Sequence, residues 1–370
     1  MGKTGKLFLL NTLAVGGSER KIVRLVNILH KRGEKVIIAY LNKPETLRPE
    51  VMDGIPTIML DRKGKYDWRV AGRIVDLITE YQIVDIICIS LQPLLNAFLA
   101  THRLRQKELN LAVCINTTDI FGIRQKLTMQ LYTPLMRRVK KIVFGCNYQR
   151  IMWTDRFNLN PEYSTVIYNG VDTRHFTVQL ENKDDLDIMT KINRRDGEII
   201  IGMIAKMRPE KSYVDALSAI RRLLDEQIPV KFVVVGDGPE YVNIKKLIDE
   251  ASLSDNVILL GQLTDVRPVL AVLDIFILTS IAVETFSNAA LEAMSMGKPV
   301  ILSDIGGAAE LLGDTGKLYP AGDVDKLVEC IKAFIFNQED RMEAGNRGRS
   351  RVVDNFSMDK MADDYVNLFS

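Results

Sequence analysis

The chain has 370 residues, of which 47% are hydrophobic and 26% are charged, and its formal net charge is +2. This composition is typical of a soluble globular protein, and it excludes a disordered chain, a collagen and a small disulfide-stapled fold. The length fits two domains or one large one.

The cysteines, the histidines and the apolar stretches indicate the cellular compartment and whether the protein binds a metal ion. The four cysteines lie far apart without a Cys-x-x-Cys pair, and there are only three histidines, so we expect a reducing compartment and no metal site. The apolar start at 7–10 is only as long as a strand, and the longest apolar stretch, 268–283, carries Asp274. We therefore expect a cytoplasmic protein that is at most peripheral at the inner face of the cell membrane.

Thirteen short runs rich in Val, Ile and Leu predict β-strands that are buried on both faces. In the first half they cover residues 6–10, 36–41, 57–60, 84–90, 111–116, 142–146 and 165–168. In the second half they cover residues 199–205, 231–236, 257–261, 275–280, 299–303 and 317–319. Strands of this kind belong to parallel sheets covered by helices, which predicts an α/β fold.

Helical segments with start and stop signals separate these runs, for example at 18–31, 212–227 and 287–296. Because an open sheet rarely exceeds about ten strands, the pattern predicts two doubly wound, Rossmann-like domains facing across a cleft. We expect these domains at 1–172 and 199–350, with a polar linker at 173–198. The remaining segment, 351–370, carries an amphipathic helix over 358–369 that docks on one domain, and it could cross back to the first.

The charge is distributed unevenly between the two halves. Residues 1–175 hold 27 Lys and Arg against 15 Asp and Glu, a net charge of +12, whereas residues 176–370 have a net charge of −10. In the first half, basic groups at 124–126 and 137–141 flank the apolar stretch 127–136. Such a helix could bind an anionic membrane surface, or it could pack in the core with its charges solvated. Nucleic acid is not an expected partner, since no binding motif is present.

In open α/β sheets, ligands bind beyond the carboxyl ends of the strands. Gly16 and Gly17 follow the first strand and would let a phosphate approach the N–H groups of a helix N-terminus, although a tight turn capped by Ser18 also fits. Lys206 and Lys211 share the loop after the first strand of the second half, where cations suit a diphosphate; a solvated charge run is the alternative.

Two further segments of the second half follow strands. Gly236 and Asp237 belong to a strand-to-helix turn, and the need for a tight turn is by itself enough to explain these residues. Glu284 lies in a loop, and Glu292 lies about one turn into the next helix, where its side chain leans back towards the N-terminus. Carboxylates accept hydrogen bonds from hydroxyls, so this pair fits a sugar or a ribose, and two solvated acids are the alternative.

Two Asp-x-Asp sequences resemble a metal–nucleotide motif, but neither is expected to bind metal. Asp185 and Asp187 lie in the expected linker, and Asp323 and Asp325 open a helix, where acids interact favourably with the helix dipole.

Taken in order, the motifs resemble those of the retaining family-4 glycosyltransferases of the GT-B fold (glycosyl transferases group 1). They are Gly-Gly-Ser-Glu at 16–19, Ile-Tyr-Asn-Gly-Val-Asp at 167–172, and the segments 204–211, 236–240, 284–292, 293–300 and 304–307 with Glu310.

This resemblance implies a nucleotide-sugar donor held mainly by the second domain, with no cofactor and no metal. Lys206 and Lys211 would grip the diphosphate, Glu284 would bind the transferred sugar and Glu292 the ribose. The remaining donor-binding positions would be Gly16, Gly17, Asn169, Gly236, Asp237, Thr285, Phe286, Ser287 and Asn288. Thr285 and Ser287 replace glycines that are common in the motif, so the identity of the donor sugar does not transfer from the family.

One departure concerns Asn116, which stands where relatives commonly carry a histidine. Asparagine can hydrogen-bond a hydroxyl but does not titrate. The front-face mechanism that the resemblance implies lets the leaving phosphate help to deprotonate the acceptor, so a histidine is helpful rather than obligatory. We expect the catalytic set to be Glu284, Lys211, Lys206 and Asn116.

The expected function is transfer of a hexose or an N-acetylhexosamine from a nucleotide-diphosphate sugar, with a UDP-sugar preferred, to a glycan or lipid-linked acceptor in cell-surface polysaccharide or glycolipid synthesis. The alternative is a catalytically silent GT-B scaffold or partner of another transferase, suggested by Asn116. A GT-B sugar-nucleotide epimerase is a weaker interpretation, because the set of Lys211, Glu284 and Glu292 follows the pattern of the retaining transferases. An oxidoreductase fits least, because no Gly-x-Gly-x-x-Gly follows either first strand.

Overall fold

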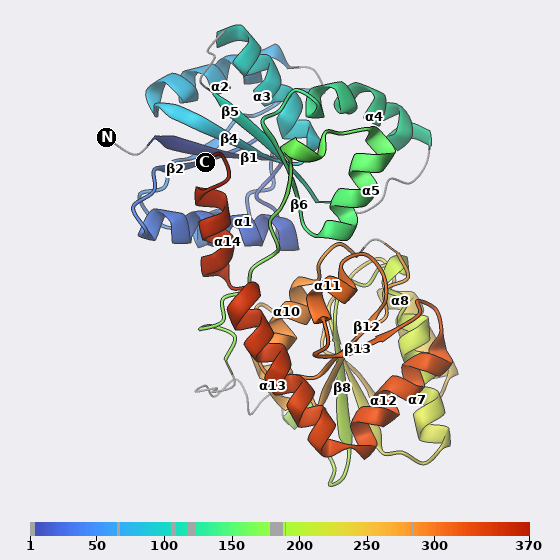
Figure 1. Ribbon diagram of the computed structural model, residues 1–370. Coiled ribbons are helices and arrows are strands. Elements are labelled where there is room, and N and C mark those ends of the chain that lie inside the picture. The colour runs from blue at the N-terminus through green and yellow to red at the C-terminus, as the bar shows by residue number, and fades with distance from the viewer. Residues whose placement is uncertain are drawn as a thin grey trace. The chain divides into compact units, whose positions relative to one another are not determined.

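The computed structural model describes residues 4–64, 67–104, 109–116, 123–177, 188, 190–282 and 284–370, with the backbone alone over 123–127 (Figure 1). The chain divides into two compact units: unit 1 comprises Met1–Gly170 and Met358–Ser370, and unit 2 comprises Val171–Ser357. Each unit is built on one parallel sheet with helices on both faces, which confirms the predicted fold of two doubly wound, Rossmann-like domains.

Unit 1 contains a sheet of seven strands in the order β3-β2-β1-β4-β5-β6-β7. The strands are β1 (Gly5–Leu10), β2 (Val36–Tyr40), β3 (Thr57–Met59), β4 (Ile83–Ile89), β5 (Asn110–Ile115), β6 (Lys141–Phe144) and β7 (Ser164–Val166). The helices are α1 (Gly17–Lys31), α2 (Trp68–Glu80), α3 (Leu91–Leu104), α4 (Ile123–Met136), α5 (Asn147–Phe157) and α14 (Met358–Val366). All seven strands fall within one or two residues of the apolar runs that predict them.

The sheet of unit 1 is buried on both faces because its side chains alternate between two apolar cores. Leu7 and Leu9 of β1 belong to the core that α2 and α3 cover, whereas Phe8 and Leu10 belong to the core beneath α1 and α14. This alternation is the two-residue period of a strand, and both sets are apolar because neither face meets water.

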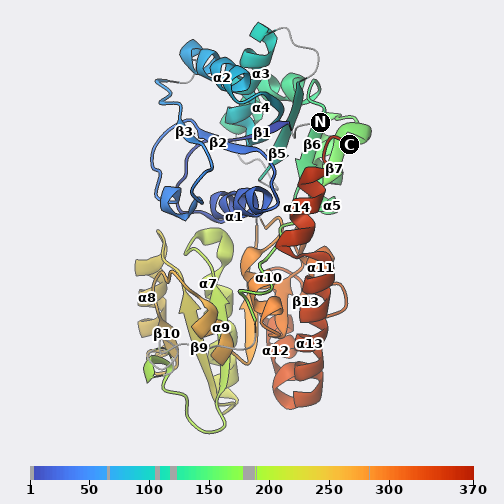
Figure 2. The same cartoon turned by 90° about the vertical axis from the view of Figure 1, so that its left-hand side faces the viewer.

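The C-terminal helix α14 packs on unit 1 beside α1 (Figure 2). Its inner face buries Met361 and Tyr365, and the Tyr365 hydroxyl lies 3.3 Å from Cys114 Sγ of β5. Its outer face is held by Arg32, whose guanidinium lies 2.6 Å from Asp359 and 2.7 Å from Asp363. The apolar contacts are the larger contribution, since exposed ion pairs contribute about 0–1 kcal/mol.

Unit 2 contains a sheet of six strands in the order β10-β9-β8-β11-β12-β13. The strands are β8 (Ile199–Ile204), β9 (Val230–Val235), β10 (Val257–Leu259), β11 (Ile275–Leu278), β12 (Val300–Ser303) and β13 (Lys317–Tyr319). The helices are α7 (Tyr213–Asp225), α8 (Tyr241–Glu250), α9 (Arg267–Val272), α10 (Asn288–Ser295), α11 (Ala308–Leu312), α12 (Val324–Phe336) and α13 (Gln338–Asn355).

The chain passes between the units after Gly170 and again after Ser357. The first passage lies two residues before the predicted boundary at 172, and the second lies inside the predicted segment 351–370. The described residues of the predicted linker, 173–198, belong to unit 2, and residues 178–187 and 189 lie outside the description. At the start and end of unit 2, Val171 N donates to Phe356 O at 2.9 Å, and Val171 bridges Ser357 in parallel.

The basic segment of unit 1 forms α4 and the turn after it. Met129, Tyr132 and Leu135 are buried in the core, whereas Leu131 is 40% exposed. These three buried side chains therefore face the protein, as in the core-packing alternative. The side chains of Arg124 and Lys126 lie outside the description. Among the described residues, no helix has the length and apolar character needed to cross a bilayer.

Candidate functional site

The site residues predicted in the second half lie in loops at the carboxyl edge of the unit 2 sheet. Lys206 and Lys211 follow β8, Gly236 and Asp237 follow β9, and Glu284 follows β11. Since β9, β8, β11 and β12 are consecutive neighbours in the sheet, their loops lie side by side. Parallel topology thus brings together charged groups that are far apart in the sequence.

The loop after β8 packs against the turn after β9. Gly236 has φ +145°, and a Cβ there would lie 1.9 Å from Ala205 O. A Cβ on Gly238 would lie 2.3 Å from Met207 O, and Met207 N donates to Asp237 O at 3.0 Å. The glycines are therefore needed for close approach of two backbones. The exposed Asp237 side chain accepts from the amide of Gly238 and so shapes its own turn.

Lys211 and Glu284 meet as an ion pair at the centre of these loops. The Lys211 ammonium donates to Glu284 Oε2 and, at 3.3 Å, to the hydroxyl of Ser280. Ser280 in turn donates to Glu284 Oε2 at 3.1 Å. The side chains of Lys211 and Glu284 are 17% and 15% exposed, so the pair is shielded yet reachable. Lys206, by contrast, is exposed at the start of the same loop.

The Glu284 backbone is packed against the loop that follows β12. Gly306 has φ +56°, and a Cβ at this position would lie 1.6 Å from Glu284 O. The next amide, Gly307 N, donates to Thr285 O at 2.9 Å. The Asp-Ile-Gly-Gly segment at 304–307 therefore holds the acidic loop in place, and any side chain at Gly306 would displace Glu284.

Helix α10 begins directly after this loop. Ser287 is the N-cap, and its hydroxyl accepts from Ala290 N at 3.2 Å. Asn288 opens the helix and, like Thr285, is half-buried, while the half-buried Glu292 lies in the second turn. The role that the family resemblance implies for Phe286 concerns its backbone amide, and its side chain is buried against the ring of Phe356 at a centroid distance of 5.1 Å. Only its backbone amide can serve a ligand.

The predicted site residues of unit 1 also lie at the carboxyl edge of their sheet. Gly16 is the N-cap of α1 and makes no side-chain cap, and Gly17 is the first helical residue. The alternative in which Ser18 caps the helix is therefore wrong, because Ser18 lies inside α1. Asn116 follows β5 and is exposed, while the residues after it, 117–122, lie outside the description.

Asn169 lies after β7 and interacts with a residue that the sequence did not single out. Its side-chain Oδ1 accepts from Lys21 Nζ of α1 at 2.6 Å. Desolvation lowers the pKa of the Lys21 ammonium. Asn169 is itself buried, so its amide is fixed by the protein.

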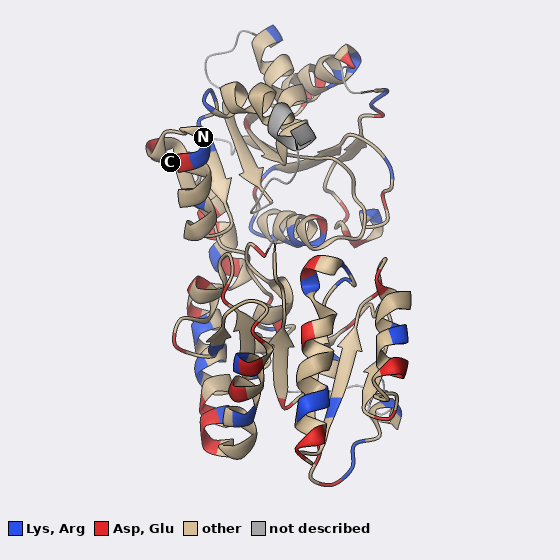
Figure 3. Cartoon of the chain, turned by 90° about the vertical axis from the view of Figure 1, so that its right-hand side faces the viewer, with Lys and Arg blue, Asp and Glu red and all other residues tan. Residues whose placement is uncertain are grey.

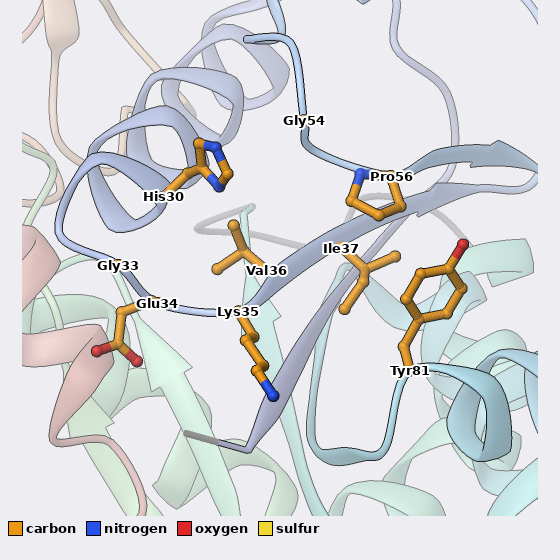
Figure 4. Close-up of a pocket in the computed structure, with 9 residues that line it drawn as sticks. All are labelled: His30, Gly33, Glu34, Lys35, Val36, Ile37, Gly54, Pro56 and Tyr81. Atoms are coloured by element: carbon orange, nitrogen blue, oxygen red, sulfur yellow. The ribbon is translucent and has the colours of Figure 1, made fainter. Parts of the chain in front are cut away.

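A cavity of about 340 Å³ lies elsewhere in unit 1, at the amino edge of β2 (Figure 4). His30, Val36, Pro56 and Tyr81 are among the side chains that line it. Because β1 and β2 run parallel, this edge is opposite to the one that carries Gly16 and Gly17. The cavity is therefore separate from the candidate site.

No group of three or more His, Cys, Asp or Glu side chains that could hold a metal ion occurs within the described part of the chain. Asp323 is the N-cap of α12 and accepts from Lys326 N at 3.0 Å, while Asp325 pairs with Arg222. Both acids of this Asp-x-Asp sequence thus have structural partners. Asp185 and Asp187 lie outside the described residues.

Sequence reasoning missed two residues that shape this site, Ser280 and Thr279, and it gave no role to Gly306 within the segment 304–307. Thr279 Oγ1 lies 2.9 Å from Lys211 O and 3.0 Å from Ser212 O. The available signal was two hydroxyl residues at the end of an otherwise apolar strand, where a buried hydroxyl must find a partner.

Comparisons with known proteins agree with this architecture. Residues 15–175 match the family model for Glycosyltransferase Family 4, and residues 184–351 match that for glycosyl transferases group 1. The Anabaena protein Alr3699/HepE in complex with UDP superposes with a TM-score of 0.85 at 20% identity, covering 99% of both chains. A structure of the same protein with UDP-glucose gives a TM-score of 0.81 at 20% identity, covering 98% of both chains. At this identity the likeness concerns the fold, which is that of the GT-B glycosyltransferases.

Two relatives are similar in sequence. The Bacillus anthracis N-acetyl-alpha-D-glucosaminyl L-malate synthase is 29% identical over 57% of this chain and 54% of its own length. A human phosphatidylinositol N-acetylglucosaminyltransferase subunit is 28% identical over 87% of this chain and 66% of its own length. The chain thus spans between about half and two thirds of the length of these relatives. With both halves matched by the family models, the chain belongs to the family-4 glycosyltransferases.

Proposed function

We propose that this glycosyltransferase moves a hexose or an N-acetylhexosamine, with retention of configuration, from a UDP-sugar to a glycan or lipid-linked acceptor. The Lys211–Glu284 pair carries this proposal, because it places a cation suited to a diphosphate beside a carboxylate suited to sugar hydroxyls. The UDP and UDP-glucose held by the Anabaena protein support the choice of donor. The names of the two relatives favour an N-acetylglucosamine donor.

In this proposal Lys206 and Lys211 hold the diphosphate and stabilise the negative charge that develops as the sugar leaves. Glu284 orients the sugar, Glu292 binds the ribose, and the amides of Phe286 to Asn288 complete the donor site. Gly16, Gly17 and Asn169 contribute from unit 1. The departing phosphate accepts the proton of the acceptor hydroxyl, so no titrating side chain is required at Asn116. We further propose that the reaction needs no metal and takes place at the cytoplasmic side of the membrane.

The test combines binding with turnover. A thermal-shift panel of UDP-, GDP- and ADP-sugars should show stabilisation by a UDP-sugar, since a ligand at 100 times its Kd adds about 2.7 kcal/mol. Donor hydrolysis or transfer is then measured with the sugar that binds. Absence of binding by every nucleotide sugar would overturn the proposal. Binding without hydrolysis or transfer would favour the catalytically silent scaffold, to which the exposed Asn116 points.

A further inference from the structure

The end of β11 holds both charged members of the candidate site at once. Thr279, which is fully buried, contacts the backbone carbonyls of Lys211 and Ser212. Ser280, which is 1% exposed, contacts the Lys211 ammonium and the Glu284 carboxylate with its hydroxyl. One strand end therefore fixes the lysine at its backbone and its side chain, and fixes the glutamate as well.

Ser280 is itself held in place by its neighbour strand. The hydroxyl of Ser303, at the end of β12, donates to Ser280 O at 2.5 Å. On the other side, Ile281 N donates to Glu210 O in the β8 loop at 2.9 Å. Because the Ser280 backbone is anchored in this way and its side chain is buried, the hydroxyl has little freedom to follow a mobile partner, so the partners adjust to it.

The hydrogen bonds made by Ser280 also decide which atoms remain for a ligand. The ammonium uses one N–H for Glu284 and one for Ser280, and Glu284 receives both bonds on Oε2. Within the described residues, the third N–H of Lys211 and Oε1 of Glu284 make no hydrogen bond. Without the hydroxyl, two opposite charges in direct contact would be free to rotate about each other and cover these atoms.

We propose that Ser280 is a positioning residue of the transfer reaction, which keeps one N–H of Lys211 and one oxygen of Glu284 directed to the donor. This inference rests on the proposed function. Ser280 does not touch the reacting atoms; it acts through Glu284 and Lys211. Its loss should therefore lower kcat more than it weakens binding of the nucleotide, because only the sugar and phosphate contacts depend on the orientation of the pair.

The experiment compares Ser280→Ala with Ser295→Ala. Ser295 is a fully buried serine of the same unit whose hydroxyl donates to Phe176 O at 2.8 Å, away from the ion pair. We expect Ser280→Ala to lower kcat about 10- to 100-fold, the usual cost of a hydrogen bond to a charged group, with a smaller change in the Kd for UDP. Ser295→Ala should change neither quantity by more than about threefold.

A double-mutant cycle separates positioning from a structural role. If Ser280 acts through the pair, Ser280→Ala should lower kcat by a clearly smaller factor in the Glu284→Ala background than in the wild-type chain, whereas independent effects multiply. Ser280→Cys, whose thiol is slightly larger than the hydroxyl and donates only weakly, replaces Ser280→Ala if the latter does not fold. Equal kcat for the Ser280 and Ser295 variants, or multiplying effects with Glu284→Ala, would overturn this inference alone. A wild-type protein that binds no nucleotide sugar would instead overturn the proposed function.

Discussion

At the residue scale, the proposal depends on two charges that neutralise each other before any ligand arrives. Glu284→Ala and Lys211→Ala each leave one shielded charge without its partner and remove one contact to the donor. We expect each variant to lose about 30- to 1000-fold in transfer rate, corresponding to about 2–4 kcal/mol.

The measurement is transfer kinetics, with a melting curve to check that each variant folds. We expect the fold to survive, because both side chains lie in loops. Arg208→Ala is a suitable control, since this exposed cation belongs to the same loop but pairs with Glu210, at 3.6 Å, and not with Glu284. Unchanged turnover in both site variants would refute the assignment of the pair.

Asn116 leads to a prediction about pH. Because an amide does not titrate, no step in the pH profile of kcat should disappear when Asn116 is replaced by alanine. The variant should also lose less activity than Glu284→Ala. A profile that changes shape in Asn116→Ala, or a larger loss there than at Glu284, would show that this position has a central role.

At the element scale, α14 supplies a large part of the core beneath α1. We expect Met361→Ala to destabilise unit 1 by about 2–5 kcal/mol, since this side chain is buried in the apolar core. Arg32→Ala removes the ion pairs to Asp359 and Asp363 on the outer face of the same helix and should cost less than about 1 kcal/mol. Denaturant unfolding curves of both variants test this ranking of the losses in unfolding free energy. A reversed order would mean that charge, and not burial, docks α14.

The contact between α14 and β5 predicts alkaline sensitivity. Burial raises the pKa of the Cys114 thiol to about 11 and raises that of the Tyr365 hydroxyl. Both groups thus hold their protons more tightly in the folded state, so their contribution to stability is complete below about pH 9 and declines as the pH rises towards 11.

Thermal melts from about pH 8 to 11 should show this decline. In Tyr365→Phe one of the two titrating groups is gone, so the loss of stability at alkaline pH should be shallower than in the wild-type chain. Parallel pH curves for the two proteins would exclude titration of the buried Tyr365 hydroxyl as a cause of the decline.

The strands were predictable because each carries its own signal. Short apolar runs mark strands such as β4 and β9 regardless of what surrounds them. The Lys211–Glu284 contact was not readable in this way, because it depends on β8 and β11 being neighbours in the sheet. The same limit applies to α4. The sequence left open whether Met129 and Tyr132 face lipid or the core, and the packing of unit 1 places them in the core.

At the scale of the whole molecule, the contrast between a basic first half and an acidic second half remains the basis for a membrane proposal. Both signs of charge are interleaved along the helices of unit 2 (Figure 3). Since Met129, Tyr132 and Leu135 of α4 are committed to the core, we expect α4 to contribute to bilayer binding by charge and not by insertion of these side chains. Each basic residue near an anionic surface contributes about 1 kcal/mol.

We therefore predict salt-sensitive co-sedimentation with vesicles rich in acidic lipid. Replacing Arg137, Arg138, Lys140 and Lys141 by glutamine should weaken it, whereas replacing four exposed cations of unit 2, Arg221, Arg222, Lys245 and Lys246, should not. If the protein stays in the supernatant at low salt, or if both sets of substitutions behave alike, the acceptor is better sought among water-soluble glycans.

The return of the chain to unit 1 at Met358 has a consequence for biosynthesis. The core of unit 1 includes Met361, Tyr365 and Leu368, which the ribosome adds only after every residue of unit 2. Domains generally fold as units while the chain emerges, so unit 2 has all its strands and helices before unit 1 does. Most of unit 1 is thus synthesised first, but unit 1 is completed last. Until α14 is synthesised, the nascent unit 1 exposes the apolar surface that this helix will cover.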